Sequence, residues 1–118
     1  MAERPVVLVV EDEFLIRMRA ADMIEDAGFK VVEAADADQA ILILESRTDI
    51  RVVFTDILMP GTMNGLKLAH AVKDRWPPVH IIATSAHALR DELPVGSVFL
   101  PKPYSERSVL GTLHALTS

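Results

Sequence analysis

The chain has 118 residues, of which half are hydrophobic and a quarter are charged, and its formal net charge is −5. This length allows one globular domain, residues 1–118, with a single core. The acidic balance argues against direct binding to nucleic acid, and the absence of cysteine excludes disulfides, zinc thiolates and thiol catalysis. Neither a signal peptide nor an apolar run of the roughly 20 residues that span a membrane is found, so a cytoplasmic location is expected.

The first half of the chain alternates between strand-like and helix-like patterns. Residues 5–10 form a β-branched apolar run, and residues 13–27 predict a helix that stops at Gly28. The inward face of this helix is expected to hold Ile16, Ala20, Met23, Ile24 and Ala27. The elements that follow are a strand at 29–34, a helix that Asp36 caps and that runs to about residue 45, and a strand at 51–55.

The second half repeats this pattern with one short element. The sequence predicts a helix from about 64 to 75, a strand at 79–83, a strand at 97–100 and a helix at 104–116. Between the last two strands there is room for about two helical turns, at about 86–92. The sequence therefore predicts only a short helical piece in this place.

Five successive β-α units predict an α/β fold in which helices cover both faces of a parallel sheet. Right-handed crossovers limit the possible strand orders. The flavodoxin-like, doubly wound order 2-1-3-4-5 places the first and third strands side by side at the topological switch point, where ligands bind beyond the carboxyl ends of the strands. No repeat, low-complexity tract or linker interrupts the pattern.

Acidic residues follow the two strands that this order makes neighbours. Glu11 and Asp12 come directly after the first strand, and Asp56 comes directly after the third. Three like charges in one pocket repel each other, which favours a bound cation. A hard divalent ion with oxygen ligands, Mg²⁺, is the expected cofactor, held by Glu11, Asp12 and Asp56.

Two further polar groups are expected at the same edge of the sheet. Ser85 follows the fourth strand and Lys102 follows the fifth. Asp56 is a candidate nucleophile toward a phosphoryl donor, because carboxylates form aspartyl-phosphate intermediates. Lys102 and the metal would neutralise charge on the transferred oxygens, and the Ser85 hydroxyl would donate to one of them.

Each of these residues alone has an ordinary explanation. Glu11 and Asp12 can be solvated loop acids before a helix, Asp56 a turn residue, Ser85 a helix N-cap and Lys102 a surface lysine. What favours the joint functional interpretation is their expected convergence at one sheet edge.

The constellation resembles the receiver domain of bacterial response regulators, of which the stand-alone, CheY-like type is the simplest. The matching motifs span nearly the whole chain and are Val-Val-Glu11-Asp12, Phe-Thr-Asp56-Ile-Leu-Met-Pro60, Gly65 at the start of the third helix, Ser85-Ala86 and Phe99-Leu-Pro-Lys102-Pro103. The resemblance implies that Asp56 accepts phosphate, with Mg²⁺, from a sensor histidine kinase or phosphotransfer protein. It also implies that the Leu58 carbonyl completes the metal site.

The resemblance implies a switch as well. Ser85 would move toward the phosphate, and Phe99 would turn inward and change the surface offered to an unknown downstream protein. Leu58 and His87 occupy the positions that tune the lifetime of the phosphoryl group, and Lys102–Pro103 would be a cis peptide. The chain also departs from the family pattern. The turn after residue 58 is one residue longer than usual, and the fourth helix is expected to be truncated or partly unwound for the family, which puts the usual signalling face in doubt.

Three classes of function stay open at this point. A phosphoacceptor signalling domain, rather than an enzyme, fits best, either as a direct effector or as a phosphate sink. A Mg²⁺-dependent phosphatase with an aspartate nucleophile usually has a second acid two residues later, where this chain has Leu58. A phosphorylation-independent interaction module has no need of the acids and the lysine. Since the chain ends just after its last predicted helix, the expected output is contact with another protein, not with nucleic acid or a membrane.

Overall fold

The computed structural model describes residues 4–59, 64–86 and 90–118. Five parallel strands form one sheet in the order β2-β1-β3-β4-β5, as the sequence predicts. The strands are β1 (Val6–Val10), β2 (Lys30–Ala34), β3 (Ile50–Asp56), β4 (His80–Ser85) and β5 (Val98–Pro101). Within the described ranges the helices are α1 (Phe14–Asp26), α2 (Ala37–Ser46), α3 (Gly65–Arg75) and α4 (Glu106–Thr117).

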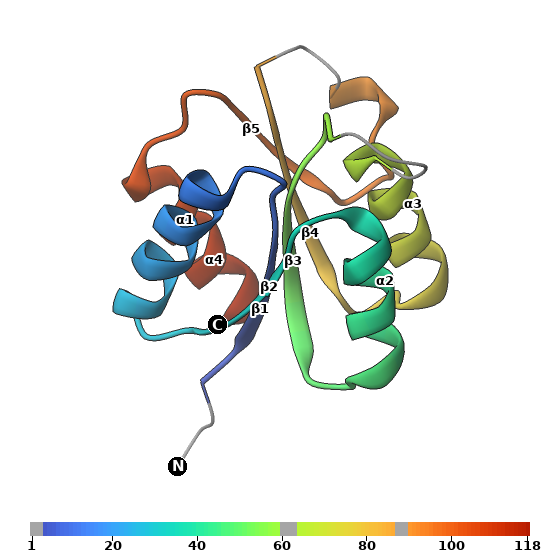
Figure 1. Cartoon of the computed structure of the whole chain (residues 1–118), viewed down its shortest axis with the longest axis horizontal. Helices are drawn as coiled ribbons and strands as arrows, with labels where there is room; N and C mark the ends of the chain where they lie inside the picture. Colours follow the sequence, from blue (N-terminus) through green and yellow to red (C-terminus); the bar gives the residue numbers. More distant parts are fainter. Residues whose placement is uncertain (1–3, 60–63, 87–89) are drawn as a thin grey trace.

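The helices form two layers around the sheet. In Figure 1, α1 and α4 lie on one side of the strands, and α2 and α3 lie on the other. Three helices begin at a side-chain cap that accepts a hydrogen bond from a backbone N–H of the first turn. These caps are Asp36, as predicted, and also Asn64 and Ser105.

Each layer has its own hydrophobic cluster, and β1 contributes to both. Val6, Leu8 and Val10 pack in the cluster beneath α2 and α3, whereas Val7 and Val9 pack in the cluster beneath α1 and α4. All five residues of the strand are buried. This is the pattern of a central strand in a sheet covered on both faces, and it holds the end of β1 firmly in place.

The first part of α1 departs from the predicted inward face. Ala20 and Ile24 are buried, but Ile16 is 37% exposed, and Phe14, Leu15 and Met18 are exposed as well. The reason is that α1 contacts its hydrophobic cluster only from Ala20 onward. Among the described residues, no helix is both long and apolar enough to cross a membrane.

The segment between β4 and β5 is short, as expected. Its described part contains a single 3-10 turn, Arg90–Glu92, and part of the helical piece predicted at 86–92 lies outside the described residues. The turn is fixed to α3 by a 2.7 Å hydrogen bond between the His70 ring nitrogen Nε2 and the Glu92 carbonyl. Leu93 packs against the cluster beneath α2 and α3.

Candidate functional site

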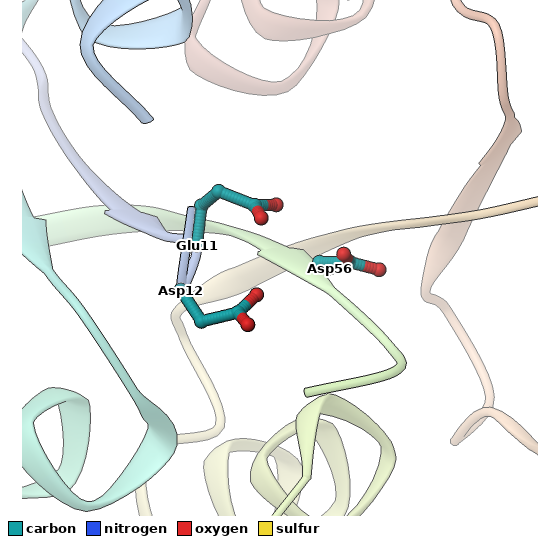
Figure 2. Close-up of side chains that lie close together, drawn as sticks. All are labelled: Glu11, Asp12 and Asp56. Carbon is teal, nitrogen blue, oxygen red and sulfur yellow. The ribbon is translucent and has the colours of Figure 1, made fainter. Parts of the chain in front are cut away.

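The three predicted acids meet at the carboxyl ends of β1 and β3. These strands are paired, with Val10 opposite Thr55, so Glu11 and Asp56 emerge beside each other. One carboxylate oxygen from each of Glu11, Asp12 and Asp56 lies within 4.8 Å of the other two. Figure 2 shows the Glu11 and Asp12 side chains leaving successive chain positions and extending toward the side of Asp56.

Burial differs among the three acids. Glu11 is 6% exposed and Asp56 is 9% exposed, whereas Asp12 lies at the solvent side. Backbone N–H groups hold the two buried carboxylates: Glu13 donates to Glu11 Oε1 over 3.2 Å, and Leu58 donates to Asp56 Oδ1 over 3.3 Å. The pocket is thus partly organised by its own loops.

The pKa of Glu11 is raised from 4.5 to about 7. Burial is the main cause of this increase, and the charge of the neighbouring Asp56 contributes to it. The hydrogen bond from the Glu13 N–H and the charge of Lys102 oppose the increase in this pKa without cancelling it. Apart from this shift, three carboxyl groups meet one ammonium group among the described residues, that of Lys102, so the pocket is short of positive charge. A bound cation would supply that charge.

Lys102 supplies part of the positive charge in the pocket. Its ammonium Nζ donates a 3.0 Å hydrogen bond to Asp56 Oδ2 and lies 4.0 Å from Glu11 Oε2. Burial lowers the pKa of Lys102, but the hydrogen bond to Asp56 and the charges of Asp56 and Glu11 outweigh it and raise this pKa above its ordinary value. The backbone N–H of Lys102 donates to the Ser85 carbonyl over 2.9 Å, and the Lys102–Pro103 peptide bond is cis.

Ser85 and Phe99, the predicted hydroxyl and aromatic residues of the site, lie on β4 and β5. Ser85 ends β4 and is 2% exposed, one position after Thr84, which pairs with Asp56. Phe99 pairs with Ala83, two residues before Ser85, and is half-buried. The guanidinium carbon of Arg90 lies 5.4 Å from the centre of the Phe99 ring.

The structure describes only one of the two residues predicted to tune the lifetime of the phosphoryl group. Leu58 is 49% exposed and lies two residues after Asp56, to whose carboxylate its backbone N–H donates. His87 lies outside the described residues, as does the turn at 60–63.

Gly65 has a structural task that its place in the motif does not reveal. Its N–H donates to the Ile57 carbonyl over 2.8 Å. A Cβ atom at this position would overlap the carbonyl oxygen of Asp56, and it would lie 2.7 Å from the Ile57 Cα. Only glycine lets the start of α3 approach the chain this closely beside Asp56.

Arg17 was missed by the sequence interpretation. Its guanidinium donates to the Glu11 carbonyl over 2.8 Å, and its Nε donates to Glu33 Oε1 over 3.2 Å. The available signal was its place three and seven residues before Ala20 and Ile24, on the otherwise apolar stripe of the predicted helix. A charge on such a stripe calls for a specific partner.

The donor set fits a hard divalent cation. Three carboxylates, two from the loop after β1 and one from the end of β3, converge, and within the described part of the chain no nitrogen or sulfur ligand of the kind that zinc or copper prefers joins them. Such a set suits Mg²⁺, and the backbone carbonyl of Leu58 is next to it in the chain. A carboxylate flanked by an ammonium and a divalent ion is equipped for phosphoryl transfer.

Comparison with known proteins identifies the family of the chain. Residues 7–112 match the family model of the response regulator receiver domain. The chain is 32% identical over 113 residues, 91% of its length, to the sensor kinase CckA of Brucella abortus (strain 2308), of which it covers 12%. It spans less than a fifth of the length of this and another curated relative.

Solved structures resemble it along nearly the whole chain. A response regulator receiver protein from Sinorhizobium medicae superposes with a TM-score of 0.89 at 26% identity, covering 97% of this chain and 94% of that one. The receiver domain of the hybrid histidine kinase CckA superposes with a TM-score of 0.82 at 27% identity, covering 96% and 99%.

Proposed function

The chain belongs to the response regulator receiver domain family of two-component signalling proteins, and on that premise we propose that Asp56 reversibly accepts a phosphoryl group from a phosphohistidine of another protein. The observation that carries the proposal is the pocket itself, in which Lys102 lies 3.0 Å from Asp56 while Glu11 and Asp12 complete an acidic cluster. The domain acts as a signalling element and not as an enzyme with a separate substrate.

The transfer is a single displacement at phosphorus. A carboxylate oxygen of Asp56 attacks the phosphorus atom, the new P–O bond forms as the P–N bond to the donor imidazole breaks, and the leaving nitrogen keeps the electron pair. Mg²⁺ held by Glu11, Asp12, Asp56 and the Leu58 carbonyl would supply positive charge that offsets the charge of the phosphoryl oxygens. Lys102 binds one of these oxygens through its ammonium group.

The same residues couple the new charge to a distant surface. A phosphoryl group on Asp56 offers acceptor oxygens to Lys102 and to the hydroxyl of Ser85. Movement of Ser85 at the end of β4 would be passed to Phe99, which lies on the neighbouring strand. The surface around Phe99 and the 3-10 turn would then change its partner, an unidentified downstream protein.

The face beside the pocket suits a protein donor. The exposed side chains of Phe14 and Leu15 begin α1 directly after the acidic loop, at 62% and 66% exposure. A hollow of about 360 Å³ next to them is lined by Ile16, Ala86, Lys102, Pro103 and Tyr104. We assign this apolar face to a histidine kinase or phosphotransfer protein in the cytoplasm, because its lining includes Lys102, which contacts Asp56, and exposed apolar patches mark interaction sites.

The test compares a small-molecule donor with a protein donor. Acetyl phosphate with Mg²⁺ is expected to add one phosphoryl group to the intact protein, detected by mass spectrometry, and Asp56→Asn is expected to abolish the addition. Turnover of many phosphate monoesters would instead indicate a phosphatase, and no addition under any condition would indicate an interaction module. Leu15→Ser should slow transfer from a phosphotransfer protein and leave transfer from acetyl phosphate unchanged, which separates docking from chemistry.

A further inference from the structure

Arg17 joins three segments around the acidic loop. It is the fourth residue of α1, and its side chain is only 15% exposed. One guanidinium nitrogen donates to the backbone carbonyl of Glu11, at 2.8 Å, and another contacts the Glu33 carboxylate on β2, at 3.2 Å. The guanidinium also lies 5.6 Å from the centre of the Phe14 ring. A single side chain thus connects α1, the β1–α1 loop and β2.

The carbonyl that Arg17 holds belongs to the peptide unit between Glu11 and Asp12. On the other side of Glu11, its N–H donates to the Ala34 carbonyl over 3.1 Å. The backbone of Glu11 is therefore held both before and after its Cα atom. Because a peptide unit is planar, fixing its carbonyl oxygen also fixes the direction in which the chain continues to Asp12.

We propose that Arg17 is a positioning residue for the divalent cation: it holds the Glu11–Asp12 peptide plane so that both carboxylates face Asp56 before the ion arrives. The inference rests on the cation site of the proposed function. Outer residues that orient metal ligands are worth about 10–100-fold in metal affinity. Glu33 limits the rotation of the Arg17 side chain and so supports the same geometry.

A purely helix-stabilising role explains less of this geometry. The Arg17–Glu33 pair is 46% exposed on the Glu33 side, and exposed ion pairs contribute little to stability. The hydrogen bond to the Glu11 carbonyl has a charged donor, so it is among the stronger ones. It acts on the loop that carries two metal ligands, and not on the body of the helix.

The experiment measures Mg²⁺ binding by NMR titration of the ¹⁵N-labelled, metal-free protein. Arg17→Ala is expected to raise the Mg²⁺ dissociation constant about tenfold and to shift or broaden the amide signals of Asp12 and Glu13 before any metal is added. Arg17→Lys keeps the positive charge but loses the planar guanidinium group with its several donors. It should therefore raise the Mg²⁺ dissociation constant by less than Arg17→Ala does. The matched control is Arg19→Ala, an exposed arginine of the same helix, which should bind Mg²⁺ like the wild type.

Phosphorylation by acetyl phosphate provides a second readout. The Mg²⁺ concentration for half-maximal rate should rise in Arg17→Ala, whereas the rate at saturating Mg²⁺ should return to within about twofold of the wild type, since no reacting group is removed. A dissociation constant for Arg17→Ala within twofold of wild type would overturn the inference while the proposed function stands. If that variant does not fold, Arg17→Lys with wild-type Mg²⁺ affinity would overturn it equally. Failure of the wild type itself to bind Mg²⁺ would overturn the cation site and the inference with it.

Discussion

The ammonium group of Lys102 donates a 3.0 Å hydrogen bond to the carboxylate of Asp56, across 46 positions of the chain. The contact joins the ends of β3 and β5, two strands that are not neighbours in the sheet. The backbone of Lys102 is itself held at the end of β4, through the bond to the Ser85 carbonyl. Three strand ends are thereby connected at the residue proposed to be phosphorylated.

Removing this ammonium should slow the chemistry and leave the fold intact. Lys102→Gln is expected to lower the rate of phosphorylation by acetyl phosphate at saturating Mg²⁺ by about 10²-fold, the usual effect of losing one donor that stabilises transition-state charge. The rate is measured by intact-mass spectrometry over time. Lys73→Gln, at an exposed lysine of α3, serves as the control. Equal rates for Lys102→Gln and wild type would remove Lys102 from the transfer step.

The raised pKa of Glu11 predicts how stability depends on pH without metal. A group that holds its proton more tightly when folded stabilises the fold fully below its unfolded pKa of 4.5, and this contribution is lost as the pH rises to about 7. Relative to Glu11→Gln, the wild type should lose about 1–2 kcal/mol of unfolding free energy between pH 4.5 and 7, a value reduced for screening by solvent.

Urea unfolding in EDTA, followed by Trp76 fluorescence, measures this difference. Saturating Mg²⁺ should remove it, because the ion favours the ionised carboxylate. A wild type and a Glu11→Gln variant with parallel pH profiles in EDTA would show that the Glu11 proton is not coupled to folding.

Gly65 and Gly111 provide a matched pair of substitutions. Gly65→Ala should lower the free energy of unfolding by about 1–3 kcal/mol, because its Cβ would overlap the Asp56 carbonyl. Gly111→Ala, on an exposed position of α4 with nothing within 4 Å of the added atom, should raise it by about 0.5–1 kcal/mol. Urea unfolding of both variants checks the opposite signs, and a stabilising Gly65→Ala would contradict the close approach described here.

The contact between Arg90 and Phe99 predicts a change in the proposed switch. A cation over an aromatic ring at an exposed site contributes about 0.5–1 kcal/mol, so Arg90→Gln should release the ring and favour the phosphorylated-like conformation about threefold. The measurement compares amide shifts of Phe99 in metal-free protein and in protein treated with beryllofluoride and Mg²⁺. In the metal-free Arg90→Gln variant, the Phe99 amide signal should lie between the two positions that it takes in the wild type without and with beryllofluoride. If beryllofluoride leaves the Phe99 signal unmoved in both proteins, Phe99 has no part in the response.

Most of the architecture could be predicted because it follows from strong, local patterns. Buried runs such as residues 5–10 fit few structures other than central strands, and β-α alternation leaves few sheet topologies. The convergence of Glu11, Asp12, Asp56 and Lys102 follows from the same topology, since the carboxyl ends of parallel strands share one edge. The chemical roles of these four residues stay predictions until phosphorylation is measured.

Other features depend on backbone geometry that no side-chain pattern encodes. One partner of Arg17 is a backbone carbonyl group, and every residue has one, so the residue types could not indicate which carbonyl Arg17 would bind. Gly65 was noted for its motif, while the approach of α3 to Asp56 appears only in three dimensions. Ile16 fits the helical period of the buried stripe, yet the hydrophobic cluster begins four residues later at Ala20.

Alternate residues of β1 belong to different hydrophobic clusters, so the strand can pair with β3 correctly in only one register. A slip of one residue against β3 would exchange the apolar sets of the two layers. It would also carry Glu11 out of reach of Asp56. Misaligned chains would therefore lose cation binding together with their packing, which makes Mg²⁺ uptake a direct gauge of whether this sheet has assembled in its native alignment.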